Sequence, residues 1–450
     1  MRRGPSGNLR GVRLAMFAVM AWSALVVPGR AQEQPVLTLT LAEARARALD
    51  ASHRLAEARA RAAAAGAAVE SRDAADRPIV AVQAGYTRTN HVTPFLVPGP
   101  GLLPRVLYPD VPDNYRTRLD VQWPIYTGGR SDALVRAAQA EASAAQADTE
   151  VARADLRLEV TRAFWSVVTG RATVSVLEQA LSRAESNVAD VRARLSAGLV
   201  PPNEVASAEA QTARQRMLLV EARNLRDVAS ADLARLVGAE ASQQVEPRAV
   251  LDEAAAPVPA RDRLVAEARA QRAERMAIEQ RVKAAQEGRS AAEAARRPQV
   301  AVGGGLDYAR PNPKIFPRTD QWDHSWDAGI SVNWSLWDGG RAASDMAQAS
   351  HQSEAARQRL ADFDATLDVE LRQRSLEIVS GEAAVAAADE GIRAATEARR
   401  VVGERYRAGV IAQSEVLDAE LALVQGELDR TRALANVRLA EARLDRALGR

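Results

Sequence analysis

The sequence WPIYTGGR at residues 123–130 returns as WSLWDGGR at residues 334–341, which is 211 residues later. RLSAG at residues 194–198 and RYRAG at residues 405–409 keep this offset without a gap. A chain rich in Ala and Arg does not hold one register over more than 100 residues by chance. The sequence therefore predicts an internal duplication.

The duplication divides the chain into two repeats, each predicted to run helix, strand, loop, strand, long helix, turn, long helix. Upstream of these matches the offset changes to 220 residues, as Arg77-Pro78 and Arg297-Pro298 show. The predicted parts are a signal peptide at 1–31, a first repeat at 32–242, an Ala- and Pro-rich linker at 243–259 and a second repeat at 260–450.

The N-terminus has the pattern of an export signal. Residues 1–13 are positively charged, and residues 14–27 form an apolar stretch without charge. This stretch is shorter than the roughly 20 residues of an ordinary membrane-spanning helix. We expect cleavage after Ala31 and export of the mature chain.

The composition excludes several classes of protein. The absence of Cys excludes a disulfide scaffold, a Cys-ligated metal site and a cysteine nucleophile. The net charge is +2, and without the five arginines of residues 1–31 it becomes −3. No dense Lys/Arg block remains to bind nucleic acid.

An enzyme is not expected either. The four His are scattered without the spacing of metal ligands, and no G-x-S-x-G motif occurs. Gly303-Gly304-Gly305 lies inside a predicted strand, where it cannot form a phosphate-binding loop ahead of a helix. We therefore expect no catalytic residues, no cofactor, no metal and no nucleic-acid partner.

Four segments alternate apolar and polar residues with a period of two, which is typical of strands. They are residues 78–89, 115–126, 298–308 and 325–337. Strands of about ten residues suit a tilted membrane strand. Aromatic residues lie near the strand ends on the apolar faces, as in a membrane girdle: Tyr86, Trp123, Tyr308, Trp326 and Trp334. A soluble sheet packed on a core would show the same alternation.

The predicted helices are long. They cover residues 131–196 and 203–237 in the first repeat, and 342–407 and 414–449 in the second. A helix over 131–196 would be about 100 Å long. In its second half apolar residues step by three and four from Val174 to Leu195, which is a heptad seam. Four strands cannot close a barrel, and an open sheet edge in lipid is costly, so several chains are expected to share one barrel. Three chains would supply twelve strands.

The ordered set of these motifs, present twice, resembles the TolC-type outer-membrane efflux protein family over residues 36–450. The resemblance implies a mainly α fold with membrane β: a homotrimer whose 12-stranded β-barrel is continuous with a long α-helical barrel. It also implies the exit duct of a tripartite export machine in the outer membrane, with the helical part in the periplasm. The implied partners are outer-membrane lipid, a periplasmic adaptor protein, and a proton-driven or ABC-type inner-membrane pump.

The resemblance assigns roles to residues at the helix turns. Gly198-Leu199 and Gly409-Val410 match the tips that contact the adaptor. Tyr406 and Glu204 match the hydrogen-bonded lock of the periplasmic gate, and Glu415 and Asp418 match the acids of its constriction. Ile411 stands where relatives often have a basic residue. The residues alone leave plainer interpretations open, because Tyr406 continues the heptad seam and the two acids can be solvated helix charges.

Other functions also fit the sequence. The same channel could serve type I protein secretion instead of the efflux of drugs, metals or similar small molecules. A different class would be a soluble periplasmic coiled-coil protein with a structural or interaction role.

Overall fold

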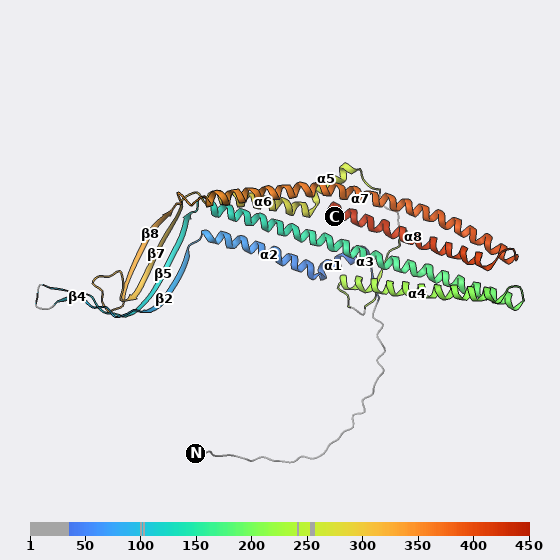
Figure 1. The fold of residues 1–450 in the computed structure, drawn as a ribbon, viewed down its shortest axis with the longest axis horizontal. Helices are drawn as coiled ribbons and strands as arrows, with labels where there is room; N and C mark the ends of the chain where they lie inside the picture. The colour runs from blue at the N-terminus through green and yellow to red at the C-terminus, as the bar shows by residue number, and fades with distance from the viewer. Residues whose placement is uncertain (1–35, 100, 102–103, 241–242, 253–256) are drawn as a thin grey trace, which may run out of the picture. The chain divides into compact units, whose positions relative to one another are not determined.

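The two repeats of the sequence appear as two similar series of helices and strands (Figure 1). The computed structural model describes residues 36–99, 101, 104–240, 243–252 and 257–450, and Val36–Arg450 form one unit. The signal peptide predicted at 1–31 lies outside the described residues.

The first series begins and ends with a three-residue strand and contains two long helices. Its elements are β1 (Leu37–Leu39), α1 (Leu41–Ala51), α2 (His53–Asp73), β2 (Ile79–Arg88), β3 (Phe95–Val97), β4 (Arg105–Tyr108), β5 (Asp113–Tyr126), α3 (Arg130–Ser196), α4 (Pro202–Leu236) and β6 (Val245–Pro247). The second series is α5 (Arg261–Gln271), α6 (Ala273–Ala294), β7 (Gln299–Arg310), β8 (Asp323–Asn333), α7 (Arg341–Arg407) and α8 (Gln413–Leu448).

The main sheet has the strand order β2-β5-β7-β8 and is antiparallel throughout. The central β5–β7 pair joins the two repeats, with Leu119 opposite Leu306. The register shifts between Pro124 and Tyr126, where proline lacks the N–H that a regular ladder needs. Strands β2 and β8 each have only one neighbour in this sheet.

The strand predicted at 325–337 ends earlier than expected, at Asn333. Asn333 pairs with Gln299, the first residue of β7, so the residues after Asn333 have no partner strand among the residues that the structure describes. The preceding Pro298 offers no N–H to extend the ladder. Trp334, predicted near a strand end, therefore lies just beyond β8.

Paired glycines make the change from strand to long helix. Gly128 and Gly129 have φ of +69° and +84°, and Gly339 and Gly340 have φ of +69° and +89°. Only glycine adopts these left-handed conformations readily, which explains why the Gly-Gly-Arg motif occurs twice. Helices α3 and α7 each have 67 residues, or about 100 Å of helix.

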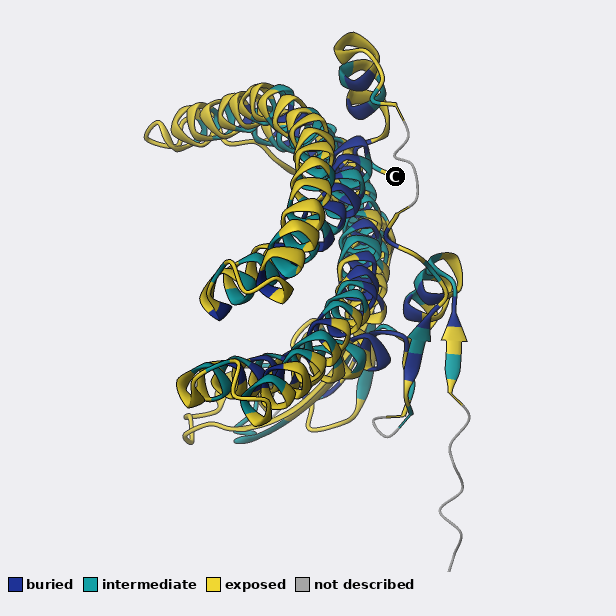
Figure 2. Cartoon of the chain, turned by 90° about the vertical axis from the view of Figure 1, so that its right-hand side faces the viewer, coloured by how far each residue is buried: buried dark blue, intermediate teal, exposed yellow. Residues whose placement is uncertain are grey.

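The long helices pack side by side. Helix α3 contacts α2, α4, α6 and α8, and α7 contacts α6 and α8. Figure 2 shows the buried residues gathered on the helix sides that face neighbouring helices. The seam from Val174 to Leu195 has no exposed residue, and neither do the matching positions from Val385 to Tyr406. No helix in the described ranges is long and apolar enough to cross a membrane.

Part of the predicted linker at 243–259 is built into the fold. Within it, β6 pairs in parallel with β1, and Val245 and Leu251 are buried with Phe164 of α3. Three-residue strands beside prolines carry no detectable period of two, so the sequence showed only the change in composition.

Candidate functional site

Two helical hairpins end in turns of the same geometry. Gly198 has φ of +70° and Gly409 has φ of +72°. The amide of Leu199 donates to the carbonyl of Arg194 at 2.9 Å, and Val410 donates to Arg405 at 3.0 Å. These are Schellman motifs, in which glycine takes the left-handed position. Each turn presents one apolar side chain to solvent, with Leu199 72% and Val410 66% exposed.

The structure brings Tyr406 and Glu204 together between the two hairpins. The hydroxyl of Tyr406, near the end of α7, donates to Oε2 of Glu204 in the first turn of α4 at 3.0 Å. The Tyr406 side chain is buried, with 7% exposure. This bond links two segments that are 202 residues apart.

Arg194 completes this contact from α3. Its guanidinium lies 4.7 Å from the centroid of the Tyr406 ring, and its Nη1 donates to the Tyr406 carbonyl oxygen at 3.3 Å. Burial, together with the bond to Glu204, raises the pKa of Tyr406 to about 12 against the opposing charge of Arg194. The hydroxyl is therefore protonated and able to donate at any physiological pH.

Glu415 and Asp418 lie apart from this contact. Both are exposed in the first turns of α8 and, being three residues apart, share one helix face. In the described part of the chain, neither side chain forms a hydrogen bond or an ion pair. Two unneutralised carboxylates thus stand at the start of the helix that follows the second tip.

Other ion pairs connect the hairpins, and the sequence did not predict them. Arg183 of α3 contacts Glu427 of α8 at 2.9 Å and Glu420 at 3.4 Å. Glu420 also pairs with Arg399 at 3.2 Å. The repeated Arg194 and Glu420 were visible in the duplicated motifs, but their partners depend on how α3 packs against α8.

The predicted girdle residues are all exposed on the sheet or beside it. Trp123 Nε1 donates to the Asp76 carbonyl at 3.0 Å, and Trp334 Nε1 donates to the Arg296 carbonyl at 3.1 Å. These two equivalent hydrogen bonds connect each strand-to-helix junction to the segment that precedes the first strand of the same repeat. At the opposite end of the sheet, Tyr308 stacks on Trp322 at 4.9 Å between centroids. Tyr86 lies 5.0 Å from Tyr115.

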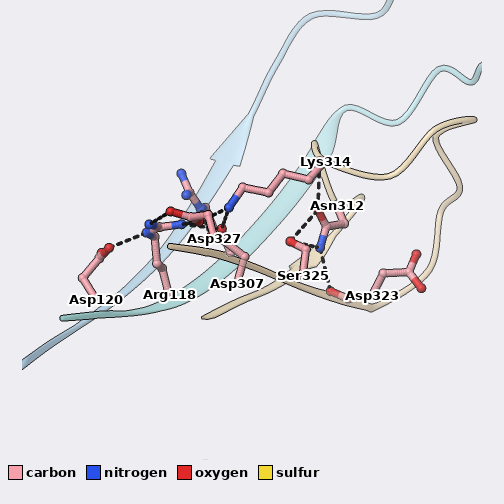
Figure 3. Close-up of polar contacts among 9 residues, drawn as sticks. Arg118, Asp120, Asp307, Asn312, Lys314, Asp323, Ser325 and Asp327 are labelled. Atoms are coloured by element: carbon pink, nitrogen blue, oxygen red, sulfur yellow. Dashed lines mark hydrogen bonds and ion pairs between the residues drawn. The ribbon is translucent and has the colours of Figure 1, made fainter. Parts of the chain in front are cut away.

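The other face of the sheet carries a charged cluster that the sequence did not predict (Figure 3). Arg118 on β5 binds Asp120, Asp307 on β7 and Asp327 on β8. Lys314, from the β7–β8 connection, reaches Asp307 at 2.9 Å and also binds Asp327. Gly305 leaves room for the Arg118 guanidinium, which a Cβ there would meet at 2.5 Å. The connection is thus held against the polar face.

No cluster of three or more His, Asp or Glu in the described ranges could hold a metal ion. The residues described above instead form contacts between helix pairs and exposed charged surfaces.

Comparisons with known proteins agree with this fold. The structure is similar to that of VceC from Vibrio cholerae, an outer membrane protein, with 20% identity, a TM-score of 0.75 and coverage of 91% of this chain and 96% of that chain. A membrane protein from Pseudomonas aeruginosa has 21% identity, a TM-score of 0.75 and coverage of 91% and 93%. The open state of the MtrE outer membrane channel of Neisseria gonorrhoeae has 19% identity, a TM-score of 0.75 and coverage of 91% and 88%.

A comparison with curated proteins gave no match. The sequence model described as outer membrane efflux protein matches residues 44–239 and 264–450, which together are most of the chain. The chain therefore belongs to the outer membrane efflux protein family, as the duplicated motifs predicted.

Proposed function

We propose that this chain is the outer-membrane channel of a tripartite export machine, and that it works as a homotrimer. It would offer a passive, wet exit path for small molecules, while an inner-membrane pump supplies the energy. The observation that carries this proposal is that both lateral sides of the chain are open, with unpaired sheet edges on β2 and β8 and exposed apolar residues on α4 and α7. Membership of an outer membrane efflux family supports the same location and role.

The open sheet edges support a shared barrel. Strands β2 and β8 each leave one edge unpaired in the sheet, and an unpaired edge in hydrocarbon costs several kcal/mol for each unsatisfied backbone group. The apolar face exposes Val80 and Val82 on β2, and Ile330 and Val332 on β8. If β8 of one copy pairs with β2 of the next, three copies give twelve strands and no edge. The charged face around Arg118 would then line the lumen.

The helices have matching open sides. Helix α4 exposes Met217, Val220, Leu225 and Val228, and α7 exposes Val369, Leu376 and Val379. Exposed apolar rows of this kind mark an interaction surface. Contact of α7 with α4 of the next copy would be a head-to-tail interface, which generates a closed ring when the rotation between copies closes.

The tip contacts support a gate within this duct. The Tyr406–Glu204 bond and the Arg194 contact would hold the two hairpins of each copy together in the closed state. The exposed carboxylates of Glu415 and Asp418, brought together from three copies, would form an acidic ring at the narrow end. Neither role needs any chemistry beyond hydrogen bonding and charge.

The proposal makes a direct prediction about location. The protein should appear in the outer-membrane fraction, require detergent for extraction and conduct ions in a planar bilayer. A soluble periplasmic coiled-coil protein would instead be released by osmotic shock and would leave the bilayer silent. Release as a soluble monomer would contradict the proposed function.

The tips should bind the periplasmic adaptor through Leu199 and Val410. Changing both residues to Asp removes apolar contacts worth about 1.5–3 kcal/mol each and adds charge, so adaptor affinity should fall at least about tenfold. The measurement is binding of the purified adaptor of the same export system to the detergent-solubilised protein. The control is Val250→Asp, an equally exposed residue in the segment between the repeats. Equal losses in both variants would place adaptor binding elsewhere.

A further inference from the structure

A cavity of about 280 Å³ lies where α1, α3 and the end of α8 meet. Four arginines and a single acid supply its charged lining: Arg45, Arg157, Arg446, Arg450 and Asp445. The remaining lining residues are Ala154, Leu158 and Ala442. The cavity therefore concentrates positive charge, and it lies far along α3 from the tip at Gly198.

Two of the arginines have acidic partners that do not line the cavity. Arg446 donates through Nε to Asp155 at 2.8 Å and also binds Glu274. Arg450 donates through Nε to Glu267 at 2.7 Å. Arg446 nevertheless has an unused group, because its Nη1 is buried and has no hydrogen-bond partner among the residues described. A buried donor without a partner costs about 1–3 kcal/mol, and more when it is charged.

The other two arginines lack a carboxylate. Arg45 uses Nε to donate to Thr161 Oγ1 at 2.9 Å, and within the described ranges neither Arg45 nor Arg157 forms an ion pair. Burial lowers the pKa of Arg45. The nearby charge of Arg157 lowers this pKa further, whereas the charge of Asp445 acts to raise it. Two guanidinium groups without an ion-pair partner among the described residues therefore line the same partly buried cavity.

The lining acid compensates this charge poorly. Asp445 has its closest cation in Arg450, whose Nη1 lies 3.8 Å from Oδ1. Burial raises the pKa of the Asp445 carboxyl, since desolvation disfavours its charged form. Among the described residues, the cavity thus has free N–H groups from three arginines and a single lining carboxyl, that of Asp445.

We propose that this cavity binds a small tetrahedral oxyanion of the phosphate type. Guanidinium groups present planar pairs of N–H donors that match phosphate oxygens, and such charge-assisted bonds are strong. One anion would satisfy Arg446 Nη1, offset the repulsion between Arg45 and Arg157, and connect α1 with α3 and α8. This site is independent of the proposed export role.

Inorganic phosphate is the probe that tests the site. In the detergent-solubilised protein, titration with phosphate should give saturable binding in calorimetry, compared with chloride at equal ionic strength. Arg157→Gln should weaken phosphate binding by about tenfold or more, as expected for the loss of a hydrogen bond to a charged group. Arg162→Gln is the matched control, because Arg162 is on the same helix, is exposed and does not line this cavity. Its phosphate affinity should change less than about twofold.

A second measurement does not depend on any variant. Phosphate should raise the thermal unfolding midpoint of the unaltered protein more than chloride does at the same ionic strength. Equal effects of phosphate and chloride would overturn the proposal. Equal losses of affinity in Arg157→Gln and Arg162→Gln would also overturn it, because they would indicate general charge screening.

Discussion

Replacing Tyr406 by Phe should open the channel at its periplasmic end. The change removes the hydroxyl that donates to Glu204 at 3.0 Å and keeps the ring on which Arg194 rests. A hydrogen bond to a charged acceptor is worth about 1.5–3 kcal/mol. The open-to-closed equilibrium of each copy should therefore shift by at least about tenfold.

Planar-bilayer recordings measure this shift as a rise in open probability or in mean conductance. Glu204→Gln keeps an oxygen acceptor and should have a smaller effect than Glu204→Ala. Tyr126→Phe is the matched control, because Tyr126 is exposed on β5 and, among the described residues, its hydroxyl has no hydrogen-bond partner. If Tyr406→Phe conducts like the unaltered protein, the bond to Glu204 is only a packing feature of the helix pair.

The lock should also resist alkaline conditions. Because the pKa of Tyr406 is about 12, its hydroxyl keeps its proton through mildly alkaline solution, and ionisation of this group should not open the channel until the pH approaches that value. Conductance that rises steeply at a much lower pH, and does so equally in Tyr406→Phe, would come from other groups.

Neutralising Glu415 and Asp418 together should abolish the cation preference of the channel. The two side chains are exposed and, among the described residues, without ion-pair partners. In the proposed trimer each would contribute one charge per copy to a narrow, water-filled ring. Charges of one sign concentrated in this way raise the local counter-ion concentration by tenfold or more. The potassium-to-chloride permeability ratio should therefore fall from about ten to near one in Glu415→Gln with Asp418→Asn.

Reversal potentials in a salt gradient give this ratio directly. The matched control is Glu382→Gln with Glu390→Gln, which removes the same number of charges from exposed positions on α7. The control should keep its cation preference. An unchanged permeability ratio in the first variant, or an equal loss of cation preference in the control, would show that Glu415 and Asp418 do not set the ion selectivity.

The periodic patterns of the sequence, together with the family resemblance of its repeated motifs, predicted the fold class. The family match and the similar structures confirm it. The alternation around Leu119 predicted strands with one apolar and one charged face, and the heptad seam from Val174 predicted the buried side of α3. The Gly-Gly-Arg repeat marked the points where strands end and helices begin. Each of these patterns is a local property, so the sequence of a single segment is enough to reveal it.

Contacts between distant segments could not be predicted in this way. The β1–β6 pair depends on three residues from each segment, and the bond from Lys314 to Asp307 depends on how a loop returns to the sheet. Arg183 finds Glu427 only because α3 packs against α8. At the tip, the heptad pattern accounts for the burial of Tyr406, and the family resemblance predicted Glu204 as its hydrogen-bond partner. The contribution of Arg194 became visible only in three dimensions.

The most direct test of the account is a disulfide scan between β2 and β8. The chain has no Cys, so Val82→Cys on β2 can react only with a second cysteine, placed in turn at Trp326, Ala328, Ile330 and Val332 on β8. Within one chain β5 and β7 lie between these strands, which puts them about 14 Å apart and beyond the reach of a disulfide.

A disulfide in this scan must therefore join two copies. The account predicts a covalent trimer at one or two adjacent positions on β8, with no larger species, because three copies close the ring. A protein that stays monomeric under oxidation at all four positions, or that forms an open series of larger polymers, would contradict the closed ring.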